Sequence, residues 1–466
     1  MINVIKQANS VAIVHSRKNP ATCKIDRRTL YTIHSKAEAL EIVGKGRQTM
    51  DTYFASLLEQ RYPEINFNWI KVHEGIIAQM DVLPDLFDYK KVILTKPFEG
   101  ALTSFMKEIC LLNPQDSISA ATVIQDYQYQ LEFLNELLQW RLDTRNQQRD
   151  KWNQDDAFFW RYALRSKGVP PEVEEMAETY FNKKDFERAE AIFRLLISCF
   201  DGYAEGHNYL GLIALEQYRL DEAVELFRKT SEIGRLLFPP KMDRESYWNV
   251  LSTRPYMRGL RNLAIALNQS GQYEQAIGIC ERLEKECGDE TSSICYKASI
   301  HLNTGSWQLA ANEALSLVSV YPEMSLLESY ALFELGQRME SFASFLHAAM
   351  NRPRTVCILT NIRMNQPREF LEIEDHNAGV SLSRSLKGFF SRQSRSSIKF
   401  YKTMANIPEV FINFVISESS KINAKGKRQV VSKMIAQLKD ASREAARKEA
   451  ERILASNAKI QKLIEG

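Results

Sequence analysis

The sequence lacks the patterns of a membrane-spanning or secreted protein. No stretch approaches 18 uninterrupted apolar residues, so we expect no transmembrane helix. The run Met1–Gln7 has no long apolar core and no small-residue cleavage site, which argues against a signal peptide. The 7 cysteines are scattered and form no Cys-x-x-Cys pair, which favours buried, reduced thiols. We therefore expect a cytoplasmic protein.

Signatures of catalysis are also missing. The stretch Gly44–Arg47 lacks the glycine spacing and the lysine–serine/threonine pair of a phosphate-binding loop. The 7 histidines form no His-Glu-x-x-His set, and no Gly-x-Ser-x-Gly elbow occurs. We expect no enzyme activity, no metal and no cofactor, and nothing indicates a small-molecule substrate.

The composition is that of a globular protein with an uneven charge distribution. The chain has 466 residues, 44% hydrophobic and 26% charged, which is enough for two or three domains. Residues 380–466 hold 18 lysines and arginines against 7 acids, a local net charge of +11, whereas the whole chain carries only +3. The remainder is therefore acidic, at −8. This asymmetry indicates either an anionic partner for the basic tail or docking of the tail on its own body.

A short pattern recurs through the middle third of the chain. Its copies read Phe186-Glu187-Arg188-Ala189, Leu220-Asp221-Glu222-Ala223, Tyr273-Glu274-Gln275-Ala276 and Trp307-Gln308-Leu309-Ala310. The alanines are separated by 34, 53 and 34 residues, so one connection carries 19 extra residues. A fifth, weaker copy lies at Gly336–Ser341. Such a fixed period predicts a stacked repeat protein.

Over about residues 166–355 this pattern resembles the tetratricopeptide repeat (TPR), a helix–turn–helix unit that stacks into an α-solenoid. A second small residue stands twelve positions before each alanine, at Ala177, Gly211, Ala264 and Ala298. Small residues at both positions let the two helices of a hairpin approach closely. We expect four to five antiparallel helix pairs across about 170–350, with the four alanines at the crossings.

The resemblance implies a concave groove lined by the first helix of each unit. Carried onto this chain, its groove-facing positions include Gln269 and Ser299 beside the five residues that we select as partner-binding: Asn208, Arg258, Arg261, Asn268 and Asn303. Asparagines can hold a peptide backbone, and arginines can hold a carboxylate with two hydrogen bonds. We expect these side chains to be exposed and to contact an acidic or carboxylate-bearing segment of another protein. The alternative is that they are solvated polar positions.

Residues 1–110 predict a small mixed α/β domain. Strand-like runs lie at 10–15, 67–72 and 91–95, and 36–60 looks largely helical. The run from Lys91 to Phe98 resembles the last strand of response-regulator receiver domains, which end it in Lys-Pro. The acidic pair and the phosphoacceptor aspartate of that family are missing, and a receiver would require a five-stranded parallel sheet within 1–112.

The remaining segments predict helices and connections. Leucines at three- and four-residue spacing indicate a helical connector over 111–165. The insertion at 231–255 contains Pro239-Pro240 and is expected to form a projecting loop. The last region, 356–466, is expected to contain a polar linker at 366–386, an apolar segment at 410–416 and a long helix at 429–464. Between them, cations alternate with aromatic residues over 384–402.

The sequence thus predicts a mainly α protein: a TPR-type solenoid with a small N-terminal α/β domain and a basic helical C-terminal region. Its expected function is that of a non-enzymatic adaptor or scaffold that binds a peptide or helix of a partner protein. One alternative is a regulatory protein with a degenerate receiver-like N-terminal domain. Another is a factor that binds a membrane or nucleic acid through its basic tail.

Overall fold

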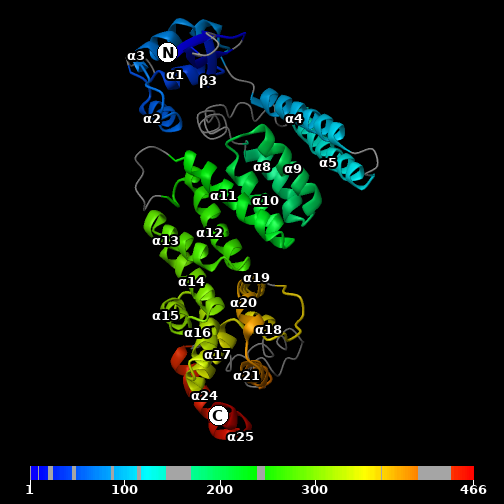
Figure 1. The fold of residues 1–466 in the computed structure, drawn as a ribbon, viewed down its shortest axis with the longest axis vertical. Helices are drawn as coiled ribbons and strands as arrows, with labels where there is room; N and C mark the ends of the chain where they lie inside the picture. The colour runs from blue at the N-terminus through cyan, green and yellow to red at the C-terminus, as the bar shows by residue number, and fades with distance from the viewer. Residues whose placement is uncertain are drawn as a thin grey trace, which may run out of the picture. The chain divides into compact units, whose positions relative to one another are not determined.

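The chain is mainly helical, with one small sheet near its N-terminus (Figure 1). The computed structural model describes residues 2–8, 10–18, 25–44, 49–85, 89–112, 117–142, 169, 171–238, 247–368, 370–407 and 442–465. The chain divides after Gly259 into two compact units.

The first unit begins with a three-stranded antiparallel sheet. Strands β1 (Ile2–Lys6), β2 (Val11–Lys18) and β3 (Ile25–Ile33) pair in sequence order, with Val4 opposite Ile13 and Ile13 opposite Tyr31. Helices α1 (Lys36–Ile42), α2 (Thr52–Arg61) and α3 (Trp69–Ala78) and the 3-10 turn η1 (Met80–Val82) follow. Side chains of β2, β3, α1, α2 and α3 share one apolar core, which includes Ile33 and Phe54.

Two of the expected strands are helices. Residues 67–72 run into α3, where the Asn68 side chain accepts a hydrogen bond from the Lys71 backbone N–H at 3.2 Å and so starts the helix. Residues 91–95 lie inside α4 (Tyr89–Leu111). Short aliphatic runs fit a buried strand and a buried helix equally well, so these two predictions were wrong. The parallel sheet that a receiver requires is not formed, because the sheet of the described residues is antiparallel.

The predicted connector contains a second long helix. Helix α5 (Ser117–Leu142) packs against α4 and against α9 (Phe186–Cys199) of the first repeat-like hairpin. Leu134 and Leu137 are buried in that contact, whereas Leu131 and Leu138 are exposed. Residues 143–168 lie outside the described part of the chain.

Helical hairpins make up the middle of the chain, as the 34-residue period predicts. The pairs are α8 (Pro171–Asn182) with α9 (Phe186–Cys199), α10 (Ala204–Glu216) with α11 (Leu220–Leu236), α12 (Arg254–Gln269) with α13 (Tyr273–Cys287), α14 (Glu290–Thr304) with α15 (Trp307–Leu317), and α16 (Met324–Glu334) with α17 (Arg338–Asn351). Within each unit, helices of neighbouring pairs pack on one another, including α9 on α10, α13 on α14 and α15 on α16.

The four repeat alanines lie in the core, as predicted. Ala189, Ala223, Ala276 and Ala310 have no exposed surface. Gly211 shows how closely the helices approach, because a methyl group added there would lie 2.5 Å from the Phe227 ring of α11. In the last hairpin Ser341 takes the alanine's place, and its hydroxyl donates a hydrogen bond to the Ser329 carbonyl of α16 at 2.9 Å.

Replacing Ala223 by leucine is expected to lower the free energy of unfolding by about 2 kcal/mol, because the added atoms overpack a position with no exposed surface. Urea unfolding of the full chain measures the change. Glu225→Leu is the control, since it adds a leucine to an exposed position of the same helix. Equal stability of the two variants would contradict the crossing geometry.

The two described ends of the 231–255 insertion are largely helical, whereas a projecting loop was expected. Helix α11 continues to Leu236, the 3-10 turn η5 covers Leu251–Thr253, and α12 begins at Arg254. The ring of Phe238 meets those of Tyr247 and Tyr256 edge-on, with centroids 4.8 and 5.2 Å apart, so both ends of the insertion pack together. Residues 239–246, with both prolines, lie outside the described residues.

The predicted polar linker at 366–386 is wrong. After α18 (Pro353–Leu359), helix α19 (Phe370–Ser385) packs against α18. The Asp375 carboxylate of α19 accepts hydrogen bonds from the backbone N–H groups of Arg354 and Thr355, at 2.7 and 3.0 Å. A polar residue of this stretch therefore caps a neighbouring helix. Composition alone does not distinguish such a capping residue from a residue of a solvated linker.

The C-terminal region is helical where it is described. Helices α20 (Lys387–Arg392) and α21 (Arg395–Ala405) follow α19, and α24 (Arg443–Ser456) and α25 (Ala458–Glu465) end the chain. The expected single helix to 464 is interrupted at Asn457, whose side chain accepts hydrogen bonds from the N–H groups of Lys459 and Ile460. The predicted apolar segment 410–416 and residues 429–441 lie outside the described residues.

Candidate interaction groove

The five residues selected from the repeat register lie on the first helices of three hairpins, and most of them are more buried than expected. Asn208 is on α10, Arg258 and Arg261 are on α12, and Asn303 is on α14. The asparagines at 208, 268 and 303 are 4%, 5% and 1% exposed, so the expectation of exposed side chains was wrong for them. The arginine side chains are 45% and 32% exposed.

In the first unit, Arg258 belongs to a carboxylate network. Its guanidinium lies 2.5 Å from Glu205 of α10, and Asn208 donates a hydrogen bond to the other oxygen of that carboxylate at 3.2 Å. Two tyrosines hold the neighbouring carboxylates of α8: Tyr203 donates to Glu174 at 3.2 Å, and Tyr209 donates to Glu178. We call Glu174, Glu178 and Glu205 the acidic cluster.

Burial and repulsion between carboxylates raise the pKa of Glu174 and Glu205. Desolvation, followed by repulsion from Glu205 and Glu178, raises the pKa of Glu174 to about 8. Desolvation also raises the pKa of Glu205, although the Arg258 charge opposes the shift. Glu174 is therefore protonated at neutral pH and takes part in the network as a neutral acid.

In the second unit, Arg261 also has a carboxylate partner. Its guanidinium lies 2.6 Å from Asp289, which is 7% exposed. The other oxygen of Asp289 accepts a hydrogen bond from the Ser292 N–H and caps α14. An acidic partner segment would therefore compete with a buried carboxylate at Arg258 and again at Arg261.

Asn268 and Asn303, which we call the asparagine clamp, hold the backbone of a distant segment of the same unit. Both side-chain amides donate hydrogen bonds to the Ser385 carbonyl, at 3.1 and 2.6 Å. The Asn303 oxygen accepts one from the Phe389 N–H at 2.7 Å, and Asn303 also donates to Asn268 at 2.8 Å. Ser385 ends α19, and Phe389 lies in the first turn of α20. The clamp thus satisfies a carbonyl and an N–H that have no partner within their own helices.

The turn between α19 and α20 fits closely against the hairpins. Phe389 is 2% exposed and packs beside Tyr330 of α16 and Trp307 of α15, with ring centroids 5.0 and 6.1 Å away. A methyl group on Gly388 would lie 2.4 Å from the Tyr273 hydroxyl and 3.1 Å from the Asn303 oxygen. A larger residue at position 388 would therefore force the Tyr273 and Asn303 side chains to shift. We call residues 370–407 the docked segment; α19 and α20 lie beside α14 in Figure 1.

The aromatic residues that alternate with cations in the docked segment belong to its core. Phe400 and Tyr401 are 1% and 3% exposed, and the Tyr401 hydroxyl donates to the Ser329 carbonyl at 2.8 Å. Arg395, Lys399 and Lys402 of the same helix are exposed. The two residue types therefore occupy opposite faces of α21, and the aromatic face is not available for nucleic-acid stacking or membrane insertion.

An ion pair attaches α24 to the last hairpin. Arg443 forms two hydrogen bonds with Glu328 of α16, at 2.5 and 2.8 Å, and Glu328 is 4% exposed. The basic tail therefore packs on the body of the second unit in two described places, as the charge asymmetry allowed. The second interpretation of the charge asymmetry, binding of an anionic partner, applies to the cations that stay exposed.

Other chemistry gives no site. Among the described residues, no three histidines, cysteines or carboxylates are placed to hold a metal ion, and the cysteines at 110, 199, 280, 287, 295 and 357 are free thiols. None of the described helices is long and apolar enough to cross a membrane. The Gly44–Arg47 motif lies mostly outside the described residues.

Several residues that take part in these contacts were not predicted from the sequence. Glu174, Glu178 and Glu205 stand at the groove positions that the register assigns to the first two hairpins, so the same register could have found them. Ser385 and Phe389 carry no such signal, because their partners are 82 and 86 residues away in the chain.

Comparisons of the chain with protein-family models, with curated proteins and with solved structures find no match.

Proposed function

We propose that this protein is a non-enzymatic, cytoplasmic scaffold with a TPR-type α-solenoid that binds a helix–turn segment of a partner protein. The observation that carries the proposal is the asparagine clamp. Two residues at groove positions of the repeat recognise the free carbonyl and N–H at a junction of two helices. Contacts of this kind read the backbone of a ligand and not its sequence.

In the second unit this recognition mode is used on the chain's own docked segment. Other groove-facing positions of the first unit, on α8 and α10, carry polar groups that are only partly buried, among them Glu174 and Glu178. We place the partner's segment on this face. Its recognition rests on backbone contacts and shape, because Arg258 is already neutralised by Glu205.

The experiment compares partners labelled in cells by the full chain fused to a proximity-labelling enzyme. Glu178→Arg changes the proposed face, and Glu225→Arg makes the same charge change on an exposed position of α11. Loss of a shared set of partners with Glu178→Arg, and their retention with Glu225→Arg, is the expected result. Thermal unfolding of both variants tests whether they remain folded. Identical partner sets for the wild type and both variants would contradict the proposal.

A further inference from the structure

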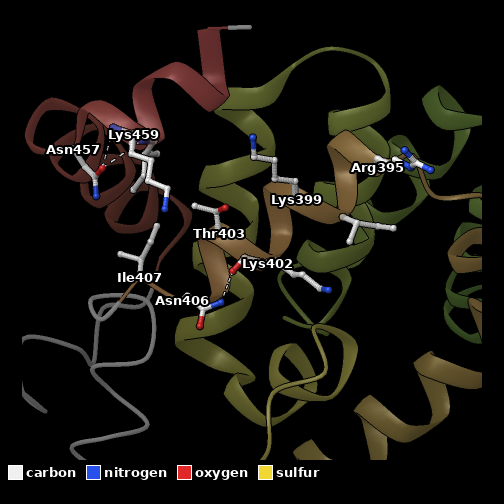
Figure 2. Close-up of a pocket in the computed structure, with 10 residues that line it drawn as sticks. Arg395, Lys399, Lys402, Thr403, Asn406, Ile407, Asn457 and Lys459 are labelled. Carbon is white, nitrogen blue, oxygen red and sulfur yellow. Dashed lines mark hydrogen bonds between the residues drawn. The ribbon is translucent and has the colours of Figure 1, made fainter.

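A pocket of about 670 Å³ lies where α21 faces the start of α25 in the second unit. Its charged lining consists of Arg395, Lys399, Lys402 and Lys459, with no carboxylate, and Thr403 and Asn406 add polar groups. Figure 2 shows Lys399 and Lys402 extending from α21 and Lys459 extending from the facing chain. We call this the cationic pocket.

The cations are concentrated there at an energetic cost. Arg395, Lys399 and Lys402 stand at i, i+4 and i+7 on one face of α21, over about 10 Å of helix. Like charges at this spacing destabilise a helix. Among the described residues none of the four cations has an ion-pair partner, whereas in α24 Lys448 pairs with Glu444 at 2.7 Å and Arg452 with Glu449 at 2.6 Å.

The shape and surroundings narrow the class of ligand. Single-stranded nucleic acid binds by stacking on aromatic side chains, and the aromatic residues of α21 are buried on its other side. An amphipathic membrane helix inserts its apolar face, and that face of α21 is part of the core. What remains accessible is a concave surface of cations and hydrogen-bonding groups, which suits a compact group of high negative charge.

We propose that the cationic pocket binds a phosphate-bearing group with more than one negative charge, such as a diphosphate or a phosphorylated lipid headgroup. The cations of the lining supply the charge that attracts the phosphate oxygens, and Ile398, Ile407 and Ile460 add apolar side chains to the wall. The N–H groups of Lys459 and Ile460 do not contribute, because Asn457 already accepts their hydrogen bonds.

The test is a titration of the full-length protein with inorganic pyrophosphate at low and physiological ionic strength. A second arm measures sedimentation with phosphatidylcholine vesicles that contain phosphatidylinositol 4-phosphate. Lys399→Glu with Lys402→Glu is the variant. Lys285→Glu with Lys448→Glu is the control, since it changes the net charge equally at exposed positions outside the pocket. Thermal unfolding of both proteins tests whether they fold.

We expect saturable, salt-sensitive pyrophosphate binding that the variant weakens at least about tenfold and the control leaves unchanged. Vesicle binding that pyrophosphate competes away identifies a lipid headgroup as the source; pyrophosphate binding without vesicle binding identifies a free ligand. Equal pyrophosphate affinity of wild type and variant, or no binding at either ionic strength, would overturn the proposal. So would binding of single-stranded RNA that the variant abolishes and pyrophosphate does not displace.

Discussion

Replacing Asn303 by alanine should destabilise the second unit by about 3 kcal/mol. The substitution removes the acceptor for the Phe389 N–H and a donor to the Ser385 carbonyl. Phe389 and Asn303 are 2% and 1% exposed, so water does not replace the lost hydrogen bonds without opening the contact. Each buried polar group left without a partner costs on the order of 1–3 kcal/mol.

Urea unfolding of the full chain, monitored by one spectroscopic probe in each unit, measures this effect. Asn312→Ala is the matched control, because Asn312 is exposed on α15 and its side-chain oxygen accepts a hydrogen bond from Gln308 of the same helix. A loss of less than about 0.5 kcal/mol with Asn303→Ala, similar to that of the control, would show that the clamp does not hold the docked segment.

The second large effect is a dependence of stability on pH that originates at Glu174. In the unfolded chain this carboxyl ionises near its ordinary pKa of 4.5, and in the folded protein near 8. The folded state therefore binds one more proton between these values, and its stability falls as pH rises through that window. The contribution is fully present below about pH 4.5 and is lost above about pH 8, with a total on the order of 5 kcal/mol.

Glu174→Gln should flatten this part of the stability profile. Glutamine keeps the shape and an acceptor for the Tyr203 hydroxyl, and it carries no charge at high pH. The measurement is the free energy of unfolding at pH 6 and at pH 9. At pH 9 the variant is expected to be more stable than the wild type. Glu175→Gln, at an exposed neighbouring position, should follow the wild type. Parallel profiles for all three proteins would contradict the assignment to Glu174.

The sequence predicted the hairpins well because their spacing is local. Ala189, Ala223, Ala276 and Ala310 are separated by a helix-pair length, and each must be small for a reason that lies within its own hairpin. The strand predictions at 67–72 and 91–95 failed for the opposite reason. A short aliphatic run is compatible with either structure, and the choice depends on caps such as Asn68 and on tertiary packing.

The site was predictable only in part. The register placed Asn268 and Asn303 on one face, and their use of backbone hydrogen bonds follows from amide chemistry. That they contact the chain's own Ser385 and Phe389 depends on a long-range packing that no local pattern encodes. Likewise, the repeat register marks Arg258 and Arg261 as groove residues but does not indicate that Glu205 and Asp289 already neutralise them.

Amide hydrogen exchange across residues 384–393 tests the central claim most directly, since it reports whether the groove face holds the docked segment by its backbone. The account predicts strong protection of this stretch, including the Phe389 amide, in the wild type and in Asn312→Ala, and its loss in Asn303→Ala. Exchange of residues 384–393 at the rate of an unprotected peptide in the wild-type protein would contradict it.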